Sequence, residues 1–148
     1  MFQSLLLALA AGAGACIALQ AAANGSLRSA VKSPEWAAYF SICGTIICAT
    51  TAMIILRPVA PATADVKQTV WWQWIGGPLG ALIVLAGATL TPKLGAATFV
   101  AFVVGGQLVC AALMDQFGLM GLAQRNLTTG RAMGAVFVIF GALLIRYW

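Results

Sequence analysis

Residues 36–56 have the sequence WAAYFSICGTIICATTAMIIL, 21 positions without a charged side chain. A helix rises 1.5 Å per residue, so this stretch would be about 31 Å long, close to the ~30 Å hydrocarbon core of a bilayer. Ser33-Pro34-Glu35 precedes it and is typical of a helix start, and Arg57-Pro58 follows it and is typical of a helix end. The stretch therefore predicts a transmembrane helix over residues 35–56.

The composition of the whole chain indicates that its solvent is lipid. Of the 148 residues, 62% are hydrophobic and 7% are charged, whereas soluble proteins average about 25% charged residues. A water-soluble domain of this length could not bury so much apolar surface. We expect an all-α integral membrane protein with a single transmembrane domain over residues 1–148, whose five helices span approximately 2–24, 35–56, 70–90, 94–114 and 128–147.

The Lys and Arg residues are divided equally between the two ends of these five spans. One side of the membrane receives Arg28, Lys32, Lys93 and Arg146, and the other receives Arg57, Lys67, Arg125 and Arg131. An excess of such residues on one side normally decides the orientation of a membrane protein. Because neither side has an excess, we expect insertion in both orientations. Two opposed copies, or one copy and an oppositely oriented homologue, would then form an antiparallel dimer, as inverted repeats do in many transporters.

Several classes of function are disfavoured by the sequence. The net charge is +5, but the basic residues lie singly in short loops and form no stripe, so we expect no nucleic-acid partner. The chain has no His, and its four cysteines lie inside apolar runs, so we expect no metal, cofactor or disulfide framework. No nucleophile–base pair is visible, and we expect no enzyme activity.

Polar residues inside the spans are the candidates for a substrate pathway, because a polar group in lipid is costly unless it is paired or hydrated. Gln107 lies near the middle of the predicted fourth helix, after Gly105-Gly106. An interhelical hydrogen bond is the alternative role for its amide. Gln20 and Asn24 share one face of the first helix and serve either the pathway or helix packing. Trp74, in an aromatic cluster suited to the headgroup region, completes the predicted pathway.

Three charged residues are candidates for coupling or gating. Glu35 complements the dipole at the start of the second helix, which is its alternative role. Asp115 follows the end of the fourth helix, where the dipole disfavours its charge. Arg131 is separated from Arg146 by only 14 uncharged residues, about 21 Å of helix. We therefore expect Asp115 and Arg131 to form an ion pair between the fourth and fifth helices, as a structural clamp rather than a direct substrate contact.

The predicted helices lack an Asp or Glu at mid-span, although a proton-coupled exporter of cations would need one. This pattern favours a neutral or zwitterionic substrate. Small residues mark three faces that we expect to pack closely against other helices: residues 8–15, the pair Gly76 and Gly80, and the set Gly130, Gly134 and Gly141. The first span has no preceding Lys or Arg and exceeds the length of a signal-peptide core, so we expect it to be retained.

Several short motifs resemble the YdcZ-like family of bacterial membrane proteins. They occur in order along nearly the whole chain: Ala18-Leu19-Gln20, Asn24, Leu27, Pro34, Trp36-Ala37-Ala38, Trp74-Ile75-Gly76-Gly77, Gly105-Gly106-Gln107, Asp115-Gln116-Phe117-Gly118 and Arg131. The resemblance implies membership of the drug/metabolite transporter superfamily, whose larger members look like two five-helix halves fused in opposite orientations. It also implies a multi-pass location in the bacterial inner membrane and antiparallel dimerisation.

The preferred hypothesis is a five-helix half-transporter that acts as an antiparallel dimer. It would export a small organic metabolite or drug by alternating access. The alternative is a non-transporting membrane subunit or assembly factor, in which the polar residues serve only helix packing. A narrow channel is least favoured, since no ring of charged residues is evident.

Overall fold

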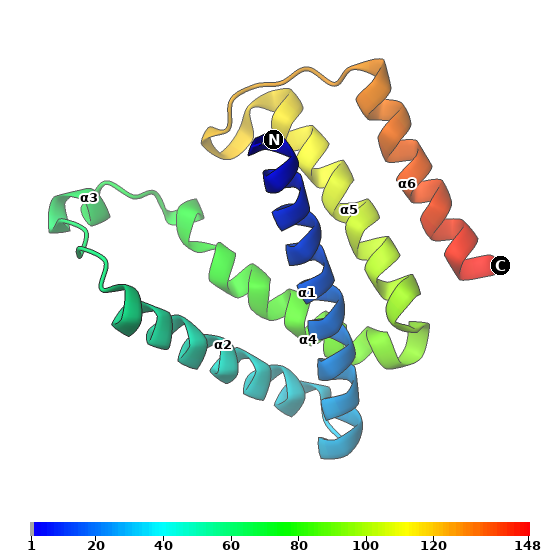
Figure 1. Cartoon of the computed structure of the whole chain (residues 1–148), viewed down its shortest axis with the longest axis horizontal. Coiled ribbons are helices and arrows are strands. Elements are labelled where there is room, and N and C mark those ends of the chain that lie inside the picture. Colours follow the sequence, from blue (N-terminus) through cyan, green and yellow to red (C-terminus); the bar gives the residue numbers. More distant parts are fainter. Residues whose placement is uncertain (1) are drawn as a thin grey trace. The chain divides into compact units, whose positions relative to one another are not determined.

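Helices make up nearly all of the structure. The computed structural model describes residues 2–148, and within that range it contains no strand. The elements in order are α1 (Phe2–Val31), α2 (Pro34–Leu56), α3 (Thr63–Lys67), the 3-10 helix η1 (Trp71–Trp74), α4 (Gly76–Leu94), α5 (Ala96–Phe117), the 3-10 helix η2 (Leu119–Gly121) and α6 (Thr129–Tyr147) (Figure 1). The predicted all-α class is confirmed.

Five helical segments are long and apolar enough to cross a membrane: Phe2–Val31, Pro34–Leu56, Trp71–Leu94, Ala96–Phe117 and Thr129–Tyr147. Most large apolar side chains on these segments are exposed. The buried hydrophobic residues among positions 2–148 are Ala21, Ala37, Ala38, Ala88, Phe99 and Ala142. Long helices with apolar exposed faces require hydrocarbon around them. The structure therefore agrees with the prediction of five transmembrane helices.

Helix α1 is longer than predicted. It was expected to end at residue 24, with Arg28 in a loop, but it continues to Val31 and contains Arg28 in its last turn. Ser29 remains compatible with the helix because its hydroxyl donates a hydrogen bond to the Gly25 carbonyl over 3.2 Å. The helix ends at Lys32, where φ is 58°. A left-handed residue ends a helix, and Arg28 at the last turn complements the helix dipole.

The ends of α4, α5 and α6 also differ from the predicted bounds. The segment expected at 70–90 begins as η1, and α4 then runs through Pro92 to Leu94. Gly95, with φ of 82°, alone separates α4 from α5, which was expected over 94–114 and extends to Phe117. Asp115 therefore lies within the last turn of α5 rather than after it. The last helix begins at Thr129, one residue after the predicted 128.

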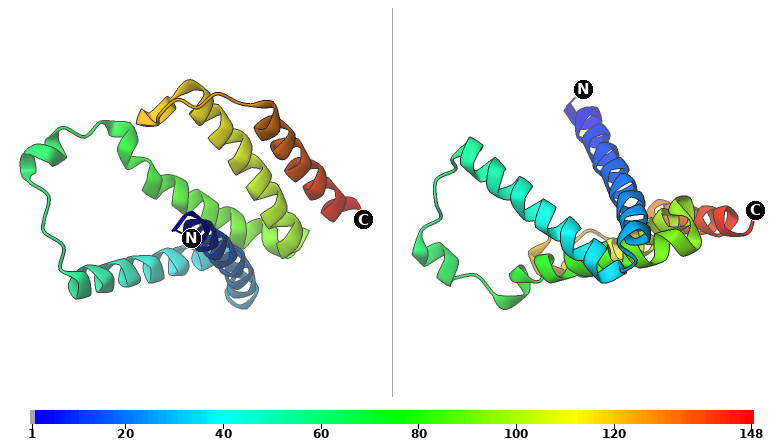
Figure 2. Two further views of the ribbon diagram at one scale, coloured as in Figure 1. Left: turned by 45° about the horizontal axis from the view of Figure 1, so that its top comes forward. Right: turned by 90° about the horizontal axis from the view of Figure 1, so that it is seen from below.

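The chain forms two compact units. The first contains the residues up to Leu19 together with Leu90–Trp148, and the second is Gln20–Thr89. In the first unit α5 and α6 lie side by side and run antiparallel (Figures 1 and 2). In the second unit α2 is joined to α4 through α3 and η1. The buried residues of this unit are small: Ala21, Asn24, Gly25, Ala37, Ala38, Gly87 and Ala88. The expectation of a single domain over 1–148 stays a prediction.

Among residues 2–148, the small-residue faces make no close helix contact within either compact unit, so their expected packing stays a prediction. A Cβ added at Gly12, Gly14, Gly76, Gly80, Gly130, Gly134 or Gly141 would meet no other atom within 4 Å in the described chain. By contrast, a Cβ at Gly105 of α5 would lie 3.8 Å from Cγ1 of Ile139 on α6. Helices α5 and α6 thus approach each other closely at Gly105, a position outside the predicted small-residue faces.

Candidate functional site

An ion pair joins the end of α5 to the start of α6. Nη1 of Arg131 lies 3.5 Å from Oδ2 of Asp115, and the two side chains are 44% and 37% exposed. The predicted pairing of these residues is confirmed. Asp115 lies at a helix C-terminus and Arg131 at a helix N-terminus, positions at which the helix dipole disfavours each charge. Pairing offsets both unfavourable interactions.

The connection between these helices, residues 118–128, folds back onto the end of α5. The Arg125 amide donates to the Asp115 carbonyl over 2.7 Å. Nε2 of Gln124 donates to the Gln116 carbonyl over 3.0 Å, and Oε1 of Gln116 accepts from the Leu127 amide. These bonds fix the position of Leu127. The N-cap of α6, Thr128, follows directly, so the bonds determine where α6 begins relative to α5.

The start of α6 places Arg131 opposite Asp115. The Thr128 hydroxyl accepts a hydrogen bond from the Arg131 amide over 3.4 Å, as expected of an N-cap. Helix α6 therefore begins before Arg131 and carries this charge on its first turn. With 19 residues it is about 28 Å long, close to the thickness of the hydrocarbon core.

A groove of about 460 Å³ lies between α5 and α6 and ends at the ion pair. Asp115 and Arg131 are the charged residues of its lining, and the remaining lining residues are apolar: Leu108, Ala111, Ala112, Leu127, Gly134, Ala135 and Val138. Gly134 leaves the groove open, because a Cβ there would meet nothing within 4 Å. The site is thus an apolar trough with two opposite charges at one end.

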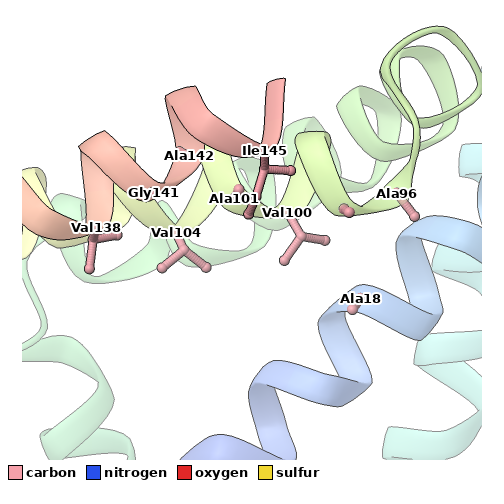
Figure 3. A pocket seen from close by; sticks show the side chains of 10 residues that line it. Ala18, Ala96, Val100, Ala101, Val104, Val138, Gly141, Ala142 and Ile145 are labelled. Atoms are coloured by element: carbon pink, nitrogen blue, oxygen red, sulfur yellow. The ribbon is translucent and has the colours of Figure 1, made fainter. Parts of the chain in front are cut away.

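A second hollow in the same unit is lined by apolar residues alone. It has a volume of about 450 Å³ and lies against the other end of α5 and α6, with Ala18 of α1 on its wall. Figure 3 shows Val100, Val104 and Val138 along this hollow. It offers no hydrogen-bonding or charged group that could orient a polar solute. The groove with the ion pair is therefore the stronger candidate site.

Gln107 does not reach this groove. It is the twelfth of the 22 residues of α5, so it lies at mid-helix as predicted. Its side chain is exposed and has no hydrogen-bond partner within residues 2–148. In hydrocarbon such an amide needs a partner from another molecule or from bound solvent. Its assignment to the substrate pathway stays a prediction.

Gln20 and Asn24 have different surroundings although they share a face of α1. Gln20 is exposed, whereas Asn24 is only 5% exposed. Nδ2 of Asn24 has no hydrogen-bond partner in the described part of the chain. A buried amide donor without an acceptor costs about 1–3 kcal/mol. Asn24 therefore has a donor available for a water molecule or a solute, and its role in the pathway stays a prediction.

Trp74 and Glu35 are both engaged in local hydrogen bonds. Nε1 of Trp74 donates to the Thr69 hydroxyl over 2.9 Å, and the indole is 63% exposed. The hydroxyl of Ser33 donates to Oε2 of Glu35 over 2.6 Å and also accepts from the Trp36 amide, which confirms Ser33 as the N-cap of α2. The bond of Trp74 spans η1, and the bond of Glu35 lies at the start of α2. The predicted pathway and gating roles stay predictions.

Gln116 is a site residue that the sequence does not single out. It lies within a family motif, but a Gln near a helix end has no distinctive pattern. The available signal was its position two residues before Gly118, a helix-ending glycine followed by a semi-apolar connection. A side-chain amide in that place can bond to the returning backbone.

Comparisons with known proteins define the class of this molecule. Residues 5–144 match the family described as "Putative inner membrane exporter, YdcZ". The chain belongs to this family, and it is a multi-pass protein of the inner membrane. It is 35% identical over 80 residues to the inner membrane protein YdcZ of Escherichia coli (strain K12). That match covers 54% of this chain and 53% of the relative, so it spans about half of each. No solved structure matches the chain.

Proposed function

We propose that two copies of this chain, inserted in opposite orientations, form one transporter of the drug/metabolite transporter superfamily. The dimer exports a small neutral or zwitterionic organic solute by alternating access. Each copy supplies five helices, so the pair has the inverted-repeat arrangement that is common among secondary transporters. A heterodimer with an oppositely oriented homologue would have the same architecture.

The main support for this proposal is the equal division of the Lys and Arg residues between the two ends of the spanning helices. With the bounds of the structure, Arg28, Lys93 and Arg146 each lie in the last turn of a spanning helix, α1, α4 and α6 respectively. If all five segments cross the bilayer, these ends and Lys32 face one side, and the other four basic residues face the opposite side. Neither orientation then has an electrostatic advantage.

The exposed polar and small residues supply independent support for a second copy. Gln107 lies at mid-span on an exposed surface of α5, where hydrocarbon would leave its amide unbonded. In an antiparallel dimer, a residue at the midplane of one copy meets the partner at the same depth. Gly141 of α6 leaves room for the close backbone approach that membrane helices use for association.

Opposite orientation also explains how transport can proceed without a large energy difference between states. The inward-open and outward-open forms of such a dimer are related by its own symmetry, so their free energies are similar. A solute or ion that binds one state better then shifts the population between them. The ion pair of Asp115 and Arg131 lies at the α5–α6 connection, where it can limit the movement of these helices.

Solute flux tests the transport function. Proteoliposomes containing the purified protein are loaded with a panel of unlabelled neutral and zwitterionic metabolites, and uptake of the radiolabelled solutes is followed. We expect saturable uptake of at least one solute, reduced at least tenfold by Gln107→Ala. Val104→Ala, a truncation at an exposed position of the same helix, is the control and should retain uptake. Absence of saturable uptake by the unmodified protein would favour the non-transporting subunit.

A further inference from the structure

We propose that the groove between α5 and α6 binds a zwitterionic amphiphile with a short apolar tail. The cationic group of the ligand contacts Asp115, its anionic group contacts Arg131, and its tail lies along the apolar lining. This inference rests on the proposed transport function, of which it names the solute class. It gives the ion pair a direct ligand contact in addition to the expected role as a structural clamp, at a site that the predicted pathway residue Gln107 does not reach.

The charged end of the groove has unused binding capacity. Arg131 and Asp115 are joined by a single contact of 3.5 Å, rather than by the two parallel bonds that a guanidinium and a carboxylate can form. The other Arg131 side-chain donors and Oδ1 of Asp115 make no further hydrogen bond to residues 2–148. Both side chains are more than a third exposed. A ligand can therefore contact both charges without breaking a compact ion pair.

The net charge of the site selects a ligand with no net charge. Asp115 and Arg131 together are neutral, so a zwitterion adds an ion pair on each side and keeps the assembly neutral. An anion or a cation alone would bring an uncompensated charge into a site with an apolar lining, which is strongly unfavourable. A neutral polar head would lose hydration without gaining two ion pairs.

The dimensions of the groove fit a small amphiphile. Its volume of about 460 Å³ lies within the usual range of about 300–1,000 Å³ for small-molecule sites. Along α6 the lining extends from Arg131 to Val138, about 10 Å of helix, which suits a short tail. The occupant is therefore a free single-tailed solute, and a bilayer phospholipid is the competing occupant that the experiment must exclude.

Binding of radiolabelled octylphosphocholine below its micellar concentration tests the proposal. The protein is placed in nanodiscs of phosphatidylglycerol, which contain no zwitterionic lipid. We expect saturable binding that weakens at least tenfold in Asp115→Asn, in Arg131→Gln and in Gly134→Val, which fills the groove. Gly130→Val is the matched control, because its Cβ also enters open space but lies outside the lining. This control should bind as the unmodified protein does. Gly134→Ala should give an intermediate loss if the larger substitution prevents folding.

Competition and lipid exchange decide between the possible occupants. Nonanoate, octyltrimethylammonium and octyl glucoside carry the same octyl tail and should compete at least tenfold more weakly than octylphosphocholine. Equal competition by octyl glucoside, or unsaturable binding in every variant, would overturn the proposal. Loss of binding in phosphatidylcholine nanodiscs would identify lipid as the occupant and would also overturn it. Binding is measured without a solute gradient, so absence of flux with intact binding contradicts the transport function alone.

Discussion

The carboxamide of Gln116 connects the end of α5 to the residue before the N-cap of α6. Its Oε1 accepts from the Leu127 amide, while its backbone carbonyl accepts from Gln124. Arg131 follows four residues after Leu127, so any shift of this connection moves the guanidinium relative to Asp115. Gln116 therefore acts by positioning the α5–α6 connection, since its side chain makes no described bond to Asp115 or Arg131.

Replacement of Gln116 by Met tests the effect of losing this hydrogen bond while the size of the side chain is kept. Gln116→Met keeps the length of the side chain but removes the acceptor, and we expect a loss of about 1 kcal/mol in the free energy of unfolding. Double-mutant cycles with Asp115→Asn and Arg131→Gln should show a coupling of about 0.5–1 kcal/mol with Gln116 in place and none after its replacement. Gln116→Glu retains an acceptor and should preserve the coupling. Equal coupling in all three backgrounds would exclude a positioning role.

Of the two side-chain contacts at this connection, one could be predicted from the sequence and the other could not. The pair of Asp115 and Arg131 was predictable, because the helix dipole disfavours the charge of Asp115 and the uncharged span between Arg131 and Arg146 is too short to cross the bilayer core. The bond from Gln116 to the Leu127 amide was not predictable. It depends on the backbone reversal at Gly118 and Met120, whose φ values are 58° and 56°. A left-handed methionine has no pattern in the sequence.

At the scale of elements, two of the spanning helices end at basic residues in the left-handed conformation. Lys32 follows α1 with φ of 58°, and Arg57 caps α2 with φ of 45°. The Arg57 amide donates to the Met53 carbonyl over 3.0 Å, which completes the last turn. A side chain with a Cβ is strained in this conformation, whereas glycine is not. Each of these basic residues places a positive charge at a helix end and also occupies a strained backbone conformation there.

Arg57→Gly should relieve the strain at the end of α2. We expect the free energy of unfolding in bicelles to rise by about 0.5 kcal/mol, since relief of strain exceeds the added entropy of glycine in the unfolded chain. Arg57→Ala removes the same charge but retains the Cβ, so it should give no such gain. If both variants have the same stability, the charge rather than the backbone determines the effect.

The five spans could be predicted and their ends could not. The length of each uncharged stretch predicted a spanning segment, because the hydrocarbon core requires about 20 residues of helix. The ends depend on single backbone conformations instead. Helix α1 continues past Asn24 until Lys32 adopts a positive φ, and α4 continues through Pro92 until Gly95 does so. Hydropathy reveals neither the continuation of α4 through Pro92 nor the break at Gly95.

At the scale of the whole molecule, the chain buries little of its apolar surface against itself. Among residues 2–148 the buried hydrophobic residues are alanines and Phe99, and most other large apolar side chains are exposed. Lipid can cover the apolar side chains, but it cannot satisfy the Gln107 amide. The sequence could indicate a partner through this residue and through its balanced charges. It could not place the partner, because packing between chains has no local pattern.

Biasing the charge division provides the test of an antiparallel assembly. Ser29→Lys with Ala30→Lys adds two charges near the end of α1, and Ala60→Lys with Ala62→Lys adds two on the opposite side; all four positions are exposed. Each pair should fix one orientation, opposite to that of the other. Orientation is read by labelling Thr63→Cys from each side, in a chain whose native cysteines are replaced.

The outcomes distinguish opposed copies from parallel ones. The balanced chain should be labelled from both sides in comparable amounts, and each biased chain from one side only. Because a biased chain can pair only with a co-oriented copy, its solute uptake should fall at least tenfold when it is produced alone. Production of the two oppositely biased chains together should restore uptake, since each then supplies the orientation that the other lacks. Full activity of either biased chain alone, or labelling of the balanced chain from one side, would contradict the antiparallel assembly.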